Sequence, residues 1–210
     1  MPAAGPDLAS APLPPGVTEA AVWDPFLRLY HWLLAISVAG AWILGSFGGA
    51  MGITRMTLHF WFGYMVIALL AFRLVWGVIG PGPARFAQFL RGPGAVMDYA
   101  RHMGARRPSY WPGHNPLGAL SVVAMMAALA AQVATGLIAD PNDFVNYGPL
   151  SAQVSAATSR AAVGWHDLGA NIVLALVVLH VAVILFYRWW KREDLIRPMI
   201  TGRKLVRRED

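Results

Sequence analysis

Four long apolar segments in this 210-residue chain restrict it to a membrane fold. Each approaches the ~20 residues with which an α-helix crosses a hydrocarbon core about 30 Å thick. Only 13% of the residues are charged, about half the share that is typical of soluble domains. The sequence therefore predicts an all-α integral membrane protein, with a bundle of four transmembrane helices over about residues 26–47, 57–79, 116–139 and 164–187.

The first 20 residues differ from these spans in composition. They are rich in Pro, Ala and Gly, and they lack apolar periodicity and the basic start of a signal peptide. We expect a disordered arm over residues 1–20, a transmembrane domain over residues 21–204, and a short charged cytoplasmic tail over residues 205–210.

The basic residues predict the orientation of the helices. The connection 80–115 holds five arginines and one acid, and the segment after the fourth span holds eight Lys and Arg residues. The other two connections contribute only Arg55 and Arg160. By the positive-inside rule, both termini and the connection 80–115 are cytoplasmic. Because the basic residues cluster in this way, the net charge of +6 indicates membrane topology and no nucleic-acid partner.

Four histidines inside the spans are the strongest functional signal, because ionisable side chains in a membrane are costly and usually functional. His166 and His180 are fourteen residues apart, a rise of about 21 Å over nearly four turns, so they share one helix face near opposite membrane surfaces. The predicted topology places His59 at the outer level with His166, and His31 at the inner level with His180.

Two imidazoles that face each other at one depth can ligate haem iron from both sides. Such an iron has no open position for oxygen, so the chemistry is one-electron transfer without a catalytic residue. The chain has no cysteine, which excludes thiolate metal sites and covalently attached haem. A zinc or copper site is the weaker alternative, because Asp167 is the only acid within the spans. The bundle is therefore expected to enclose two b haems.

Arg73 follows His59 by fourteen residues, which places it at the depth of the inner pair. We expect it to bind the haem propionates, with snorkelling to the interface as the alternative. Glycines near the histidines can make room for a porphyrin or simply allow close helix packing: Gly45, Gly63 and Gly169.

His102 and His114 lie in the basic connection 80–115. We expect both to be solvated loop residues.

Several motifs resemble those of one family. They are "VWDPFLRLYHW" (22–32), "LHFWFGY" (58–64), "FRLVWG" (72–77), "GHNPLG" (113–118), "WHDLGANIVLALVVLHV" (165–181) and "LIRPMITGRK" (195–204). Over roughly residues 20–204 the chain resembles the bacterial cytochrome b561 family, whose superfamily includes the b-type cytochrome subunits of nickel hydrogenases. The small b561 branch is expected to be the nearer one, because the first span of the hydrogenase subunits is differently flanked.

This resemblance implies a cytochrome with two b haems in the bacterial inner membrane that exchanges electrons with quinone as part of a respiratory chain. The family's ligand positions fall on the four histidines within the spans. The resemblance also implies a quinone pocket near the inner haem, and the candidates for it are His102, His114 and the basic connection 80–115. The expected function is electron transfer between the quinone pool and a periplasmic redox partner, such as a cytochrome c or an oxidoreductase subunit.

Two alternatives remain open at this point. One is a superoxide oxidase that passes electrons to ubiquinone, and the other is a haem-containing membrane anchor of a larger oxidoreductase such as a hydrogenase. A superoxide oxidase should carry a cationic outer funnel. The outer side is instead nearly neutral, because two basic residues face two acidic ones: Arg55, Arg160, Asp140 and Asp143. Its long loop suits the docking of a protein through three large apolar or aromatic side chains: Phe144, Tyr147 and Leu150.

Overall fold

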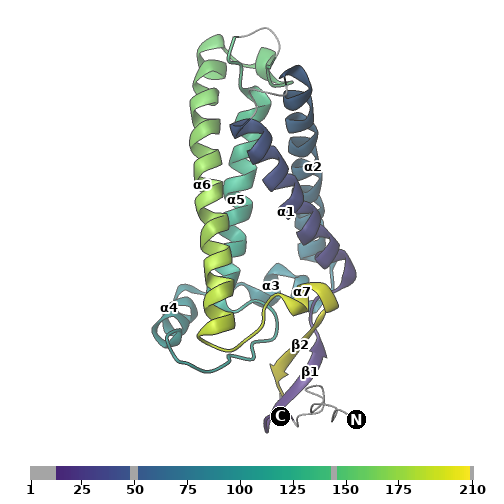
Figure 1. Ribbon diagram of the computed structural model, residues 1–210, viewed down its shortest axis with the longest axis vertical. Coiled ribbons are helices and arrows are strands. Elements are labelled where there is room, and N and C mark those ends of the chain that lie inside the picture. The colour runs from purple at the N-terminus through teal and green to yellow at the C-terminus, as the bar shows by residue number, and fades with distance from the viewer. Residues whose placement is uncertain (1–12, 48–51, 143–145, 209–210) are drawn as a thin grey trace, which may run out of the picture.

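Four long helices form an elongated bundle in the computed structural model, which describes residues 13–47, 52–142 and 146–208 (Figure 1). Within these residues, the four helices are long and apolar enough to cross a membrane. The predicted four-helix membrane fold is confirmed. The helices are α1 (Pro25–Ser46), α2 (Gly52–Ile79), α5 (Pro116–Ile138) and α6 (Ala156–Trp189).

Side-chain caps fix where three of these helices begin. The carboxylate of Asp24 accepts hydrogen bonds from backbone N–H groups in the first turn of α1, and Asn115 and Ser155 cap α5 and α6 in the same way. Such residues satisfy amide groups that have no partner inside the helix. The Ser155 cap makes α6 begin eight residues before the predicted position 164. At 34 residues, α6 is about 51 Å long and extends beyond the hydrocarbon core.

The bundle consists of two helix pairs. Helix α1 packs on α2 and α5 packs on α6, while the pairs touch each other mainly through α2 and α5. A central cluster of buried residues joins the pairs at mid-height: Val66, Leu70, Leu129 and Val173. Large apolar side chains on the outer helix faces are exposed, such as Ile36, Trp61 and Val178. Such faces suit contact with lipid.

The short elements gather at one end of the bundle, which we call the cap (Figure 1). The opposite end, with the 3-10 turn η3 (Ser151–Gln153), is called the distal end. The cap contains β1 (Val17–Ala21), the 3-10 turn η2 (Gly82–Ala84), α3 (Phe86–Phe89), α4 (Pro93–His102), α7 (Arg197–Thr201) and β2 (Arg203–Arg207).

The cap differs from the expectation of a disordered arm and a free tail. Strands β1 and β2 pair antiparallel, with Val17 opposite Arg207 and Ala21 opposite Arg203. Side chains of β2 alternate between buried and exposed, as expected of a strand with one covered face. This short period-two pattern is easily overlooked beside the apolar spans. Residues 1–12 of the arm and 209–210 of the tail lie outside the described residues.

A buried ion pair ties the C-terminal segment to the loop before α5. Lys204 Nζ lies 3.0 Å from Glu193 Oε1, and their side chains are only 7% and 6% exposed. The backbone N–H and the hydroxyl of Ser109 both donate to Glu193 Oε2, and Lys204 donates to the carbonyl of Trp111. Burial alone would raise the pKa of Glu193, but Lys204 and Ser109 outweigh it and the pKa is lowered.

Candidate cofactor sites

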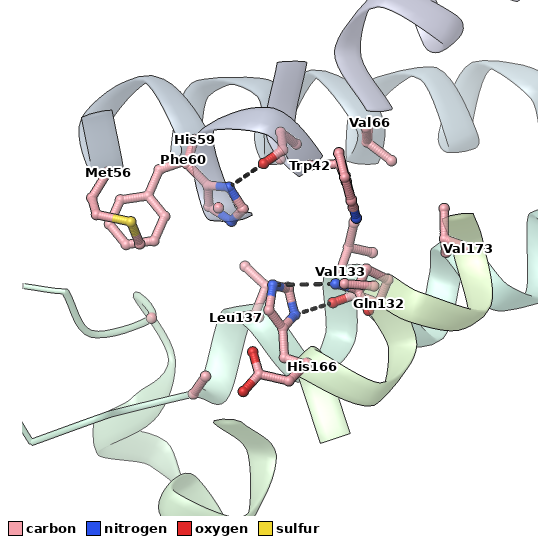
Figure 2. Close-up of a pocket in the computed structure, with 18 of the residues that line it drawn as sticks. Trp42, Met56, His59, Phe60, Val66, Gln132, Val133, Leu137, His166 and Val173 are labelled. Carbon is pink, nitrogen blue, oxygen red and sulfur yellow. Dashed lines mark hydrogen bonds between the residues drawn. The ribbon is translucent and has the colours of Figure 1, made fainter. Parts of the chain in front are cut away.

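His59 on α2 and His166 on α6 form the distal histidine pair. Their rings point toward one another across a cavity (Figure 2), with ring centres 6.0 Å apart. The cavity has a volume of about 550 Å³, within the range of ordinary ligand and cofactor sites. Its walls come from α1, α2, α5, α6 and the distal connections.

Backbone carbonyls orient both rings of the distal pair. His59 Nδ1 lies 2.8 Å from the carbonyl oxygen of Ala41, and His166 Nδ1 lies 3.0 Å from that of Gln132. A carbonyl oxygen can only accept, so each Nδ1 carries the proton and donates it. Each Nε2 therefore keeps a lone pair for a metal. In Figure 2 the side-chain amide of Gln132 lies 3.3 Å from His166 Nε2.

Glycines leave room for the two distal rings. A Cβ at Gly45 would lie 3.3 Å from Cε1 of His59, and one at Gly136 would lie 2.8 Å from Cε1 of His166. Gly63 lines the same cavity, with open space where a side chain would begin. Gly169 fits the alternative of close helix packing, because its Cβ would overlap Gln132 Oε1, so the glycine lets α5 approach α6. Gly136 was not predicted. The other glycines were identified by their spacing from a histidine on the same helix, and α5 contains no histidine.

His31 on α1 and His180 on α6 form the cap-side histidine pair. Their ring centres lie 6.4 Å apart. The edge of Trp32 packs against the His31 ring at 5.2 Å between centres. His31 Nδ1 is shielded from solvent and has no hydrogen-bond partner in the described part of the chain. Among the described residues, His31 therefore has no carbonyl partner of the kind that orients His59 and His166.

Arg73 on α2 is buried beneath the cap. Its side chain is 2% exposed, and its guanidinium carbon lies 4.5 Å from the ring centre of Phe86 and 5.7 Å from that of Phe89. Its two terminal nitrogens have no hydrogen-bond partner among the described residues. Snorkelling would bring the guanidinium to solvent, whereas α3 of the cap covers it. A buried cation without a counter-ion is costly, so the site calls for an anion.

The two histidines of the connection 80–115 have different environments. His102 is exposed at the end of α4, as expected. His114 is not a solvated loop residue: its ring packs between those of Trp23 and Phe89, with centres 4.7 and 4.8 Å away. Burial, followed by the charges of Arg73 and Lys204, lowers the pKa of His114 to about 3. The prediction failed because it treated the connection as a solvated loop instead of a folded cap.

Both histidine pairs fit a b-type haem. Two imidazoles that bind one metal through Nε2 at about 2 Å have ring centres roughly 6 Å apart, close to the distances in both pairs. At the distal end, the cavity offers space for a porphyrin. On the cap side, the guanidinium of Arg73 suits the carboxylates of a porphyrin. No group of three or more His, Cys, Asp or Glu residues that could hold a metal ion occurs within the described ranges.

Comparison with known proteins agrees with this site chemistry. Residues 22–202 match the family described as Prokaryotic cytochrome b561. The chain is 25% identical to a probable Ni/Fe-hydrogenase B-type cytochrome subunit of Rhizobium leguminosarum bv. viciae and 26% identical to one of Azotobacter vinelandii, with 90% of each chain covered in both comparisons. It is 22% identical to the probable Ni/Fe-hydrogenase 1 B-type cytochrome subunit of Escherichia coli (strain K12), covering 86% of this chain and 88% of that one.

The family match spans most of the chain, and these three relatives are all b-type cytochrome subunits. The expectation that the small b561 branch is nearer stays a prediction. A b-type cytochrome with four apolar helices is a multi-pass membrane protein whose haem b serves electron transfer. The chain thus belongs to the prokaryotic cytochrome b561 family.

Proposed function

We propose that this chain carries electrons across the bacterial inner membrane through two bis-histidine b haems, between the quinone pool and a redox partner on the periplasmic side. The observation that carries the proposal is the presence of two facing histidine pairs at opposite ends of one bundle. His166 and His180 lie on one helix, about 21 Å apart along its axis. The two pairs therefore span most of a hydrocarbon core.

Each pair has a defined role in this proposal. His59 and His166 hold the distal haem, and His31 and His180 hold the cap-side haem. Bound haem supplies one-electron exchange at an iron without an open coordination position. Arg73 neutralises the propionates on the cap side. The central apolar cluster around Val66 excludes water between the two levels.

The charge distribution supports a cytoplasmic cap. The connection 80–115 and the segment after α6 hold most of the basic residues and form most of the cap, so the positive-inside rule places the cap and both termini in the cytoplasm. Quinone would then exchange electrons near the cap-side haem, and the protein partner would dock at the distal end.

A subunit of a larger oxidoreductase is the favoured class of partner. The curated relatives are named as cytochrome subunits of Ni/Fe hydrogenases, which supports the membrane-anchor alternative as well. Tyr147 and Leu150 at the distal end are 54% and 44% exposed, and they suit protein contact. Phe144, the third predicted docking residue, lies outside the described residues.

A vectorial assay tests the relay. The protein is reconstituted in one orientation in liposomes that contain ferricyanide, and an impermeant reductant is added on the distal side. The wild type should reduce the trapped ferricyanide, and His180→Ala should not. Full transfer by His180→Ala would overturn the relay. Replacing the reductant with superoxide tests the oxidase alternative, which predicts reduction of added ubiquinone without any partner protein.

A further inference from the structure

A third buried histidine lies beside the cap-side pair. His114 follows Gly113, whose φ of +89° makes the tight turn before α5. Trp23 and Phe89 hold the imidazole between their rings. His114 Nδ1 is shielded from solvent and has no hydrogen-bond partner within the described chain. A buried polar atom without a partner destabilises the fold, which indicates that His114 Nδ1 has a partner in the functional protein.

The location of His114 connects it with the cap-side histidines. Its ring and the guanidinium of Arg73 both pack against Phe89. The charges that lower its pKa include those of Arg73, Lys204, His180 and His31, so the ring lies within electrostatic reach of the cap-side pair. With a pKa of about 3, the imidazole is neutral near pH 7 and offers one N–H donor.

Two nearby carboxylates already have hydrogen-bond partners. The carboxylate of Asp24, whose charge reaches Arg73, accepts from Trp76 and from two backbone N–H groups of α1. Glu193 is bound to Lys204 and Ser109. Among the described residues at this end, the two terminal nitrogens of Arg73 and the Nδ1 atoms of His31 and His114 have no hydrogen-bond partner. The carboxylate oxygens of a ligand can accept hydrogen bonds from N–H groups at these positions.

We propose that His114 is a positioning residue that donates a hydrogen bond from Nδ1 to a propionate of the cap-side haem, next to the charge contact from Arg73. This rests on the proposed function, because it requires a haem between His31 and His180. The stacking of His114 between two aromatic rings fixes its direction before the cofactor arrives. A fixed donor loses little conformational entropy on binding.

Two variants separate this role from simple packing. His114→Phe keeps an aromatic ring between Trp23 and Phe89 but removes the donor. His114→Asn has an amide that can donate from near the Nδ1 position. His102→Phe is the matched control, because it removes an exposed histidine from the same cap. Each full-length protein is purified in detergent, and its haem content, both midpoint potentials and its rate of quinone reduction are measured.

The wild type must first show two haems per chain. If the wild type lacked the cap-side haem, the proposed function would be rejected, whatever the role of His114. His114→Phe should then lower the cap-side midpoint potential, because an unpaired propionate favours oxidised iron, and leave the distal potential unchanged. His114→Asn should recover part of the shift, and His102→Phe should match the wild type.

Three outcomes would overturn the assignment. One is a cap-side potential that stays at the wild-type value in His114→Phe. Another is equal loss of the cap-side haem in His114→Phe and His114→Asn, which would mean a packing role. The third is an unchanged potential with loss of quinone reduction, which would assign the donor to a quinone.

Discussion

The two histidine pairs occupy opposite ends of one bundle and are held in different ways. At the distal end, carbonyls of Ala41 and Gln132 accept from both rings, and a cavity of about 550 Å³ lies between the helices. At the cap end, His31 Nδ1 and the terminal nitrogens of Arg73 are buried and have no hydrogen-bond partner among the described residues. Protein carbonyls thus orient the distal rings, whereas a bound anionic ligand is the proposed partner of Arg73 at the cap end.

This difference predicts an order of potentials. Hydrogen bonds from the distal rings to carbonyls make the imidazoles more basic and favour oxidised iron. A buried cation on the cap side favours the reduced state. We therefore expect the distal haem to have the lower midpoint potential, which makes electron flow toward the cap favourable.

The largest effects should come from the ligands. His59→Ala or His166→Ala should remove the distal haem, and His31→Ala or His180→Ala the cap-side haem, so each variant keeps about half of the wild-type content. Low-spin EPR signals and haem-to-protein ratios measure this. If His59→Ala and His31→Ala removed the same haem, the assignment of the pairs would be wrong.

The ion pair in the cap should have the next largest effect. Lys204→Met leaves the Glu193 carboxylate buried without its partner, which should destabilise the fold by roughly 3–5 kcal/mol. Thermal unfolding in detergent measures the change, and Lys204→Met combined with Glu193→Gln should recover much of it. Arg203→Met, which alters an exposed pair with Glu19, is the control and should have little effect.

The same ion pair predicts a pH dependence. The pKa of Glu193 is lower in the folded chain than in the unfolded chain. Its stabilising contribution is therefore fully present above the unfolded value of about 4.3 and is lost as the pH falls through the folded value. The difference in stability between the wild type and Glu193→Gln should shrink in that acidic range. A difference that is constant from pH 7 to pH 3 would contradict this prediction.

Removing the buried cation Arg73 should reduce the difference between the midpoint potentials of the cap-side and distal haems. Arg73→Leu should lower the cap-side potential by an amount on the order of 60 mV, a tenfold change for a one-electron couple. Arg73→Lys should cause a smaller shift, because it keeps the charge. Redox titration followed in the visible haem bands measures both. An unchanged cap-side potential in Arg73→Leu with full haem content would show that Arg73 does not pair with the propionates.

The features that sequence could predict are those with a strong local signal. The four spans follow from runs of apolar residues, and the levels of the histidines follow from the fourteen-residue spacing. The pairing of β1 with β2 joins residues nearly 190 positions apart, and only five residues on each side carry the pattern. The burial of His114 depends on Trp23 and Phe89 from other parts of the cap, so its local sequence could not reveal it.

The smallest effect should come from the glycines of the distal site. In Gly45→Ala, the new methyl group would lie 3.3 Å from the His59 ring, so the ring must move by a few tenths of an ångström. That movement strains the bond from Nδ1 to the carbonyl of Ala41 and should alter the distal EPR signal slightly. Gly164→Ala is the matched control, because its methyl group would meet no atom within 4 Å and Gly164 is not among the described residues that line the distal cavity. The cap-side signal should be unchanged in both variants. A change of the cap-side signal in Gly45→Ala would show that the geometry of one histidine pair depends on the other. An equal change of the distal signal in both variants would show that the contact with His59 is not the cause.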